Sequence, residues 1–168
     1  QAFPAQKPNT TKGRSDPDRG RWFIFPGQRQ GNISVRHPGL YRIRIQLSAI
    51  PSFKGRMPRI SIWNNRLKRS EIGREVIAAE DKPTVVEIEA FLPQGGFRLT
   101  NESPGKLDDG HTLSFTPRTV TSLRTYKTTR PTGYKFFTDD GQSIFPLLLV
   151  DWMEHDGPIL TENDGKKR

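Results

Sequence analysis

The stretch Ile144-Phe-Pro-Leu-Leu-Leu-Val-Asp-Trp-Met-Glu-His-Asp-Gly-Pro158 is the most apolar run in a chain that is otherwise polar and basic. Its continuous apolar segment, Leu147–Val150, is typical of a strand covered on both faces, although periodicity alone also allows a buried helix. Pro146 near the start and Gly157-Pro158 at the end leave about ten residues between them, which favours a strand. We therefore predict that this segment is the central closing strand of a β-sandwich.

The composition is that of one domain built from short strands. The chain has 168 residues, of which 32% are hydrophobic, with 15 glycines and 14 prolines to make turns. It contains no cysteine, so disulfides, a thiol nucleophile, cysteine-bound zinc and c-type haem attachment are excluded in this piece. No stretch approaches the ~20 apolar residues of a membrane span, so we expect none.

Two segments alternate between apolar and polar residues and predict half-buried strands. In Leu40–Leu47, every second side chain from Tyr41 onward is apolar, and the residues between them are Arg42, Arg44 and Gln46. Thr84–Leu92 alternates in the same way. If these strands are neighbours, Glu87 and Glu89 would face Arg42 and Arg44 across the ladder.

Further short strands separated by turns follow the same logic. We expect them at 22–25, 32–36, 59–63, 97–100 and 113–115, while 71–79 fits a strand first and a helix second. Together they predict an all-β, two-sheet jelly-roll (galactose-binding-like) β-sandwich with irregular tails. The predicted boundaries are a linker or arm at 1–20, the sandwich at 21–160 and a polar tail at 161–168. A long polar excursion follows at 122–143, and excursions of this length on a compact domain are often functional.

The net charge of +9 is unevenly distributed. Residues 42–74 and 118–135 carry most of the excess base, whereas the charged groups of 136–160, His155 aside, are all acids. A solvated basic face is favoured over a nucleic-acid site, because no helix-turn-helix, zinc finger or RNA-binding aromatic motif accompanies the charge. Nucleic acid is therefore an unlikely partner by this reasoning.

Catalytic motifs are not evident. The three histidines include two in or beside turns, His37 and His111, and no nucleophile elbow, phosphate loop or dinucleotide fingerprint is present. Glu154 and Asp156 lie two residues apart on one strand face, which favours a structural or calcium role over glycosidase chemistry. We predict that the chain is not an enzyme.

Sugar binding by a sandwich needs an aromatic plate together with amides, carboxylates or arginines that read hydroxyl groups. A tryptophan at a strand end more often caps the core than contacts a ligand, and that alternative stays open. The candidate ligand-binding residues are those at the end of the 59–63 strand and two aromatics of the excursion: Trp63, Asn64, Asn65, Arg66, Arg59, Tyr134 and Phe136.

Asp151 is the candidate metal ligand. It lies between Val150 and Trp152 in the apolar strand, where an unpaired carboxylate would be costly. The turns at 108–110 and 139–141 also carry paired aspartates, but such sequences are common in turns and supply only part of a calcium shell.

Three motifs carry a resemblance to a known family. Gly39-Leu-Tyr-Arg-Ile-Arg-Ile-Gln-Leu-Ser-Ala49, Gln94-Gly-Gly-Phe-Arg-Leu99 and Leu149-Val-Asp-Trp-Met-Glu154 resemble the jelly roll of family-six-type carbohydrate-binding modules. The resemblance implies that Asp151 helps to hold a structural calcium. The Glu-x-Glu strand with which that family supplies further calcium ligands is absent here.

The chain is also similar, over about residues 20–160, to a sandwich domain of large planctomycete proteins. Pro131-Thr-Gly-Tyr134, Asp139-Asp-Gly-Gln142 and Leu148–Pro158 carry this similarity. It implies an exported (periplasmic or extracellular), cytochrome c-like multidomain parent, whose haem would lie outside this cysteine-free piece.

From these observations we expect a non-catalytic carbohydrate-binding module, for a polysaccharide, within a larger exported bacterial protein. The arginines of 42–74 favour an anionic glycan, because arginine pairs bidentately with carboxylate or sulfate. The alternative is a structural or protein–protein interaction module that orients neighbouring domains of the same longer chain without binding a ligand.

Overall fold

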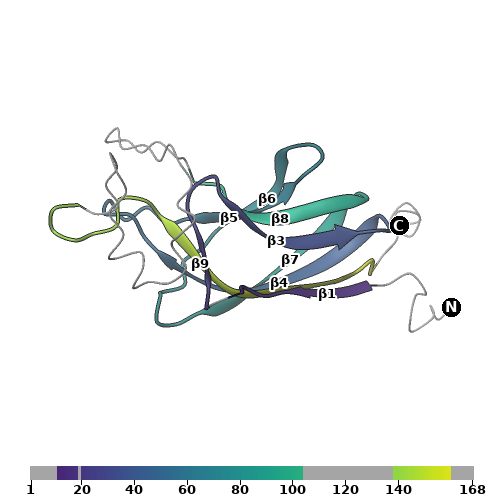
Figure 1. Ribbon diagram of the computed structural model, residues 1–168, viewed down its shortest axis with the longest axis horizontal. Coiled ribbons are helices and arrows are strands. Elements are labelled where there is room, and N and C mark those ends of the chain that lie inside the picture. The colour runs from purple at the N-terminus through teal and green to yellow at the C-terminus, as the bar shows by residue number, and fades with distance from the viewer. Residues whose placement is uncertain (1–10, 19, 104–137, 160–168) are drawn as a thin grey trace.

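The computed structural model describes residues 11–18, 20–103 and 138–159, and these form two antiparallel sheets that pack against each other (Figure 1). The fold is therefore the predicted all-β sandwich. The five-stranded sheet contains β1 (Thr11–Ser15), β2 (Trp22–Ile24), β4 (Gly39–Ile50), β7 (Thr84–Leu92) and β9 (Leu147–Gly157). The four-stranded sheet contains β3 (Arg29–Val35), β5 (Arg59–Asn64), β6 (Arg69–Glu75) and β8 (Gly95–Asn101).

Strand β9 is the interior strand that the apolar run predicted. It pairs with β1 and β2 along one side and with β4 along the other, and all of Leu147–Val150 is fully buried. Because both edges of β9 are hydrogen-bonded and its apolar half is out of water, this segment closes the five-stranded sheet.

Strands β4 and β7 confirm the alternation. Tyr41, Ile43, Ile45 and Leu47 are fully buried, and they join the apolar side chains of both sheets in one core cluster. The register pairs Arg42 with Glu89 and Arg44 with Glu87, as the alternating pattern of the two segments predicted. Each such cross-strand pair contributes about 0.2–1 kcal/mol relative to alanines.

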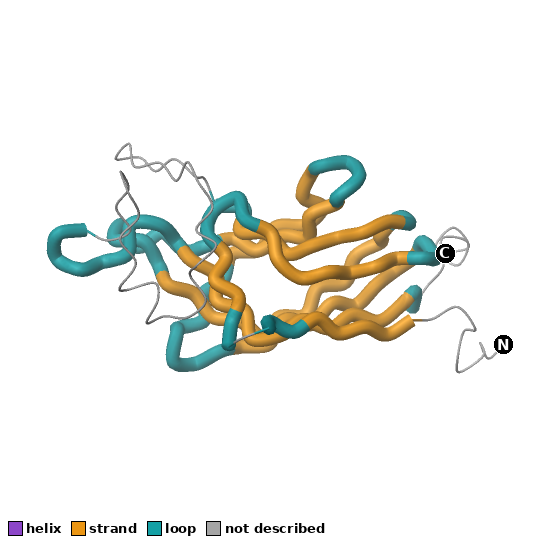
Figure 2. Tube along the Cα trace, viewed as in Figure 1, coloured by secondary structure: helices purple, strands orange, loops and turns teal. Residues whose placement is uncertain are grey.

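The chain is wound so that it passes repeatedly from one sheet to the other. The order along the sequence from β2 to β5 alternates between the sheets, and it does so again from β6 to β9 (Figure 2). The consecutive strands that share a sheet are β1 and β2, which both pair with β9, and β5 and β6, which form a hairpin. Over the described residues, no helix is long and apolar enough to cross a membrane.

Asn101, at the end of β8, links the two sheets by hydrogen bonds. Its fully buried side chain donates from Nδ2 to the carbonyl oxygens of Ile24 and Pro146, each at 2.9 Å. Its Oδ1 accepts a hydrogen bond from the backbone nitrogen of Ser103 at 3.1 Å. The amide thus satisfies buried backbone groups at the end of β2 and just before β9.

We predicted that residues 1–20 form a linker or arm. Strand β1 lies within that range and pairs with β9, so this part of the segment belongs to the sandwich. Its pattern lacks apolar residues because Lys12 and Arg14 face outward, while position 13 carries a glycine. The strand reading of 71–79 is confirmed by β6 for its first part, as far as Glu75. The predicted strand at 113–115, most of the excursion and the tail at 161–168 lie outside the described residues.

Candidate functional site

The outer face of the five-stranded sheet carries a row of alternating charges that crosses four strands. The register places Arg14 of β1, Glu154 of β9, Arg44 of β4 and Glu87 of β7 side by side. Glu154 joins Arg14 at 3.7 Å and Arg44 at 3.1 Å, and Arg44 reaches Glu87 at 3.2 Å. Hydrogen bonds from Arg44 to Glu154 and then to Glu87 raise the pKa of that guanidinium above its ordinary value.

The next row repeats the same order of charges but is not closed. It consists of Lys12, Asp156, Arg42 and Glu89 on the same four strands. Arg42 turns toward β7, with ion pairs to Glu89 and Glu87 at 3.3 Å. Among the described residues, nothing hydrogen-bonds to the buried Oδ1 of Asp156. Asp156 thus lies in register between two cations, and among the described residues no ion pair joins it to either.

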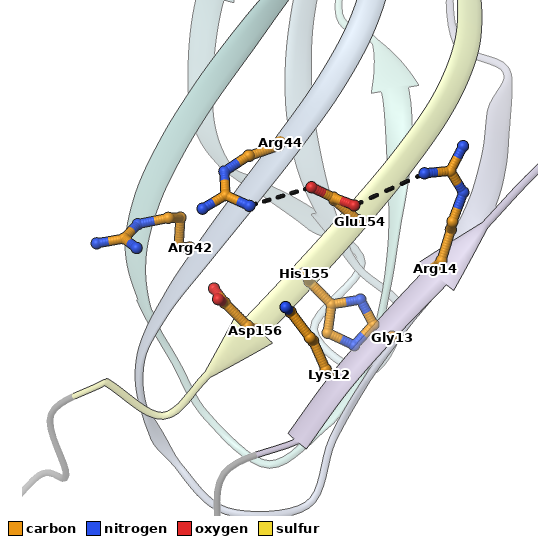
Figure 3. Close-up of a pocket in the computed structure, with 8 residues that line it drawn as sticks. All are labelled: Lys12, Gly13, Arg14, Arg42, Arg44, Glu154, His155 and Asp156. Atoms are coloured by element: carbon orange, nitrogen blue, oxygen red, sulfur yellow. Dashed lines mark hydrogen bonds and ion pairs between the residues drawn. The ribbon is translucent and has the colours of Figure 1, made fainter. Parts of the chain in front are cut away.

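A hollow of about 280 Å³ lies at this gap. Figure 3 shows the carboxylate of Asp156 pointing into the space between Arg42 and the end of Lys12, beside the closed row of Glu154. The residues that line the hollow come from β1, β4 and β9: Lys12, Gly13, Arg14, Arg42, Arg44, Glu154, His155 and Asp156. This volume is close to the lower limit of ordinary small-ligand pockets, about 300 Å³.

His155 lies on the opposite side of β9 from the two acids, against strand β1. A Cβ atom at position 13 would lie 2.8 Å from His155 Nε2, so glycine is what lets the imidazole ring cover β1. The ring is buried, and its Nδ1 takes part in no hydrogen bond among the described residues. Burial lowers the pKa of His155 below its ordinary value, although the neighbouring Asp156 acts in the other direction.

This histidine predicts a fall in stability under mild acid. Since its pKa is lower when folded than when unfolded, protonation favours the unfolded chain; the stability present above about pH 6.5 is lost as the pH falls toward the folded pKa. Urea unfolding at a series of pH values between about 7.5 and 5.5 measures this loss. The variant His155→Gln should remove that component of the slope, whereas His37→Gln, at an exposed turn position, should keep it. Equal slopes in both variants would contradict the assignment.

The sequence-predicted ligand residues separate in the structure. Trp63 and Arg59 lie on β5, and Arg29 covers the Trp63 ring with its guanidinium carbon 4.0 Å from the ring centre. Arg59 lies 3.8 Å from Glu102. Asn64 is buried, and its Oδ1 accepts hydrogen bonds from the backbone nitrogens of the following turn, which is a structural role.

Asn65 and Arg66 are exposed in the turn between β5 and β6. The Asn65 side chain lies near Gly96 of β8, so it remains close to Trp63, whereas the structure gives no contact of Arg66 with that ring. Tyr134 and Phe136 lie outside the described residues. The predicted ligand set is therefore brought together only in part, around Trp63 and Asn65.

Asp151 occupies a β-bulge of β9, since the register passes from Val150 opposite Leu47 to Trp152 opposite Gln46. Its Oδ1 lies 3.1 Å from Arg21 Nε, and its Oδ2 accepts a hydrogen bond from Gln46 Nε2 at 2.9 Å. A cation and an amide donor satisfy the carboxylate, and they do not fit calcium, which requires six to eight oxygen ligands. Among the described residues no three acidic or histidine side chains cluster as a metal site. Calcium at Asp151 stays a prediction that this donor set does not support.

From the sequence, Lys12 and Arg14 carried no binding prediction, and Asp156 only a structural or calcium role. The sequence does contain a pattern that indicates charged rows on one sheet face, because pairs of charged residues spaced two apart occur at 12–14, 42–44, 87–89 and 154–156. That these segments lie on neighbouring strands is shown only by the strand order β1-β9-β4-β7.

The fold and this face together define an antiparallel β-sandwich with a charged hollow on one sheet. Comparison with protein-family models and with curated proteins gives no match for the chain.

Proposed function

We propose that this chain is a non-catalytic carbohydrate-binding module of a larger exported bacterial protein, and that the hollow at Asp156 receives the sugar. The observation that carries the proposal is the open row, in which a carboxylate with an unfilled acceptor atom lies between Lys12 and Arg42. The sequence resemblance to carbohydrate-binding jelly rolls agrees with this assignment.

The chemistry of the hollow suits a hydroxylated ligand. A sugar hydroxyl both donates and accepts hydrogen bonds, so one hydroxyl can donate to Asp156 while its neighbour accepts from Lys12 or Arg42. Lys12 is exposed and flexible, and it can move aside to admit a ligand to the carboxylate. The closed row beside it holds Glu154 in place, which keeps the floor of the hollow rigid.

This face does not itself favour a strongly anionic ligand. Arg42 and Arg44, which belong to the basic segment 42–74, are ion-paired to Glu87, Glu89 and Glu154. Such exposed pairs contribute little to stability, about 0–1 kcal/mol, but they neutralise the guanidinium groups. A neutral sugar is therefore the better candidate for the hollow.

The proposal predicts that Asp156→Asn weakens binding of a neutral oligosaccharide about tenfold or more, because the charged acceptor is lost. Isothermal titration of the chain with a panel of neutral oligosaccharides, with calcium and then with a chelator, measures this effect. Asp81→Asn makes the same charge change at an exposed turn and should bind as the unmodified chain does. The proposal fails if the unmodified chain binds no member of the panel, or if both variants bind equally.

A module that contacts neighbouring domains without binding a ligand is the second candidate. It is favoured by apolar side chains that are exposed on β7 and just after β6: Phe91 is 57% exposed, Val85 48% and Ile77 79%. A photo-reactive residue at position 91 of the full-length parent protein would test this contact. Cross-linking to another domain of the same chain supports the second candidate, and its absence together with glycan binding supports the first.

A further inference from the structure

A second charged site lies on the outer face of the four-stranded sheet. Trp63 of β5 is in register with Arg98 of β8, and Arg29 of β3 stacks over the Trp63 ring at 4.0 Å. The register neighbours on this face are small: Thr100 lies beside Arg29, and Ser70 lies beside Trp63. The tryptophan and the two arginines therefore rise above a floor of short polar side chains.

The two guanidinium groups differ from those of the five-stranded sheet because neither meets a carboxylate among the described residues. Arg98 donates from Nε to the carbonyl oxygen of Gly31 at 3.2 Å, which fixes its orientation and leaves its terminal nitrogens available. The guanidinium carbon of Arg29 lies over the Trp63 ring, and the face of the ring attracts this cation. Among the described residues these two cations have no carboxylate partner, and one of them, Arg29, lies over the Trp63 ring.

We propose that Arg29 and Arg98, supported by Trp63, form a site for an oxyanion, a carboxylate or sulfate group, carried by an acidic glycan. A guanidinium edge matches two oxygens of such a group, and an arginine already stacked on a ring has less conformational freedom to lose on binding. The glycan as carrier rests on the proposed function, whereas the oxyanion site rests on the arginines alone. The sandwich would then read hydroxyls on one sheet and acid groups on the other.

The test measures binding of the chain to polygalacturonate, dextran sulfate, neutral dextran and polyglutamate by titration at fixed ionic strength. The double variant Arg29→Gln/Arg98→Gln is expected to bind polygalacturonate or dextran sulfate about tenfold or more weakly than the unmodified chain. The control Arg36→Gln/Lys82→Gln removes the same charge at exposed positions between strands and should change affinity less than about twofold. Arg29→Lys keeps the charge but loses the paired N–H donors of the guanidinium group. Its affinity for the acidic polysaccharide should therefore be closer to that of the double variant than to that of the control.

The four polymers and the variants distinguish the possible results. A loss confined to polygalacturonate or to dextran sulfate identifies the oxyanion as carboxylate or sulfate, and either result supports the proposal. Equal losses in the double variant and its control would show general charge attraction and overturn it. Equally strong, variant-sensitive binding of polyglutamate would overturn the glycan as carrier. The sugar site at the hollow is tested separately. If the unmodified chain binds no neutral oligosaccharide, or if Asp156→Asn does not change that binding, the hollow is not a sugar site, whatever the oxyanion test shows.

Discussion

Replacing Phe97 with alanine is expected to lower the free energy of unfolding by about 4 kcal/mol, because it removes a large side chain from a closed core. Phe97 is fully buried on β8, where the register places it between Ile33 of β3 and Asn64 of β5. Strand β8 is hydrogen-bonded on both sides, to β3 and to β5, which limits how far the backbone can collapse into the cavity. Urea unfolding followed by tryptophan fluorescence measures the change.

The chain provides a matched control for this substitution. Phe91 on β7 is 57% exposed on the outer face of the five-stranded sheet, so Phe91→Ala should cost no more than about 1 kcal/mol. Comparable losses at positions 97 and 91 would mean that the inward and outward faces are assigned incorrectly.

Replacing Asn101 with alanine is expected to cost a similar amount, about 4 kcal/mol, by a different mechanism. The substitution leaves two buried carbonyl groups and one backbone N–H without partners, and each orphaned group costs about 1–3 kcal/mol. The same unfolding measurement applies, and Asn101→Leu, which fills the space without restoring the hydrogen bonds, should remain strongly destabilised.

Asn32 is exposed on β3 and provides the comparison for position 101. Asn32→Ala should lie within about 0.5 kcal/mol of the unmodified chain. If Asn101→Ala were as mild, the amide would not be the link between the sheets that its hydrogen bonds indicate.

The sheets were predictable where apolar periodicity is strong. The alternation in Leu40–Leu47 and Thr84–Leu92, and the continuous run at Leu147–Val150, follow directly from which side chains must leave water. Strand β1 escaped prediction because it buries almost no apolar side chain of its own. Its inward position at Gly13 is filled by a histidine from β9, a relation that local sequence does not reveal.

The candidate site was less predictable than the fold. Trp63 and its neighbours were chosen as residue types suited to sugars, but Asn64 is used by its own turn and Arg59 approaches Glu102. The hollow depends on which strands are adjacent and on one carboxylate left out of an otherwise continuous row. Neither property belongs to any single segment, so no local pattern indicates it.

The alternating rows also determine how the edge of the five-stranded sheet meets other copies of the chain. The rows end on β7 with Glu87 and Glu89, and Arg74 donates from Nη1 to the backbone carbonyl of Glu87 at 3.2 Å. Antiparallel pairing of two β7 strands about Ile88 would set Glu87 of one copy opposite Glu89 of the other, like charge against like, with one carbonyl already occupied. An edge that would otherwise template aggregation is thereby protected by the same acids that complete the sheet's ion pairs.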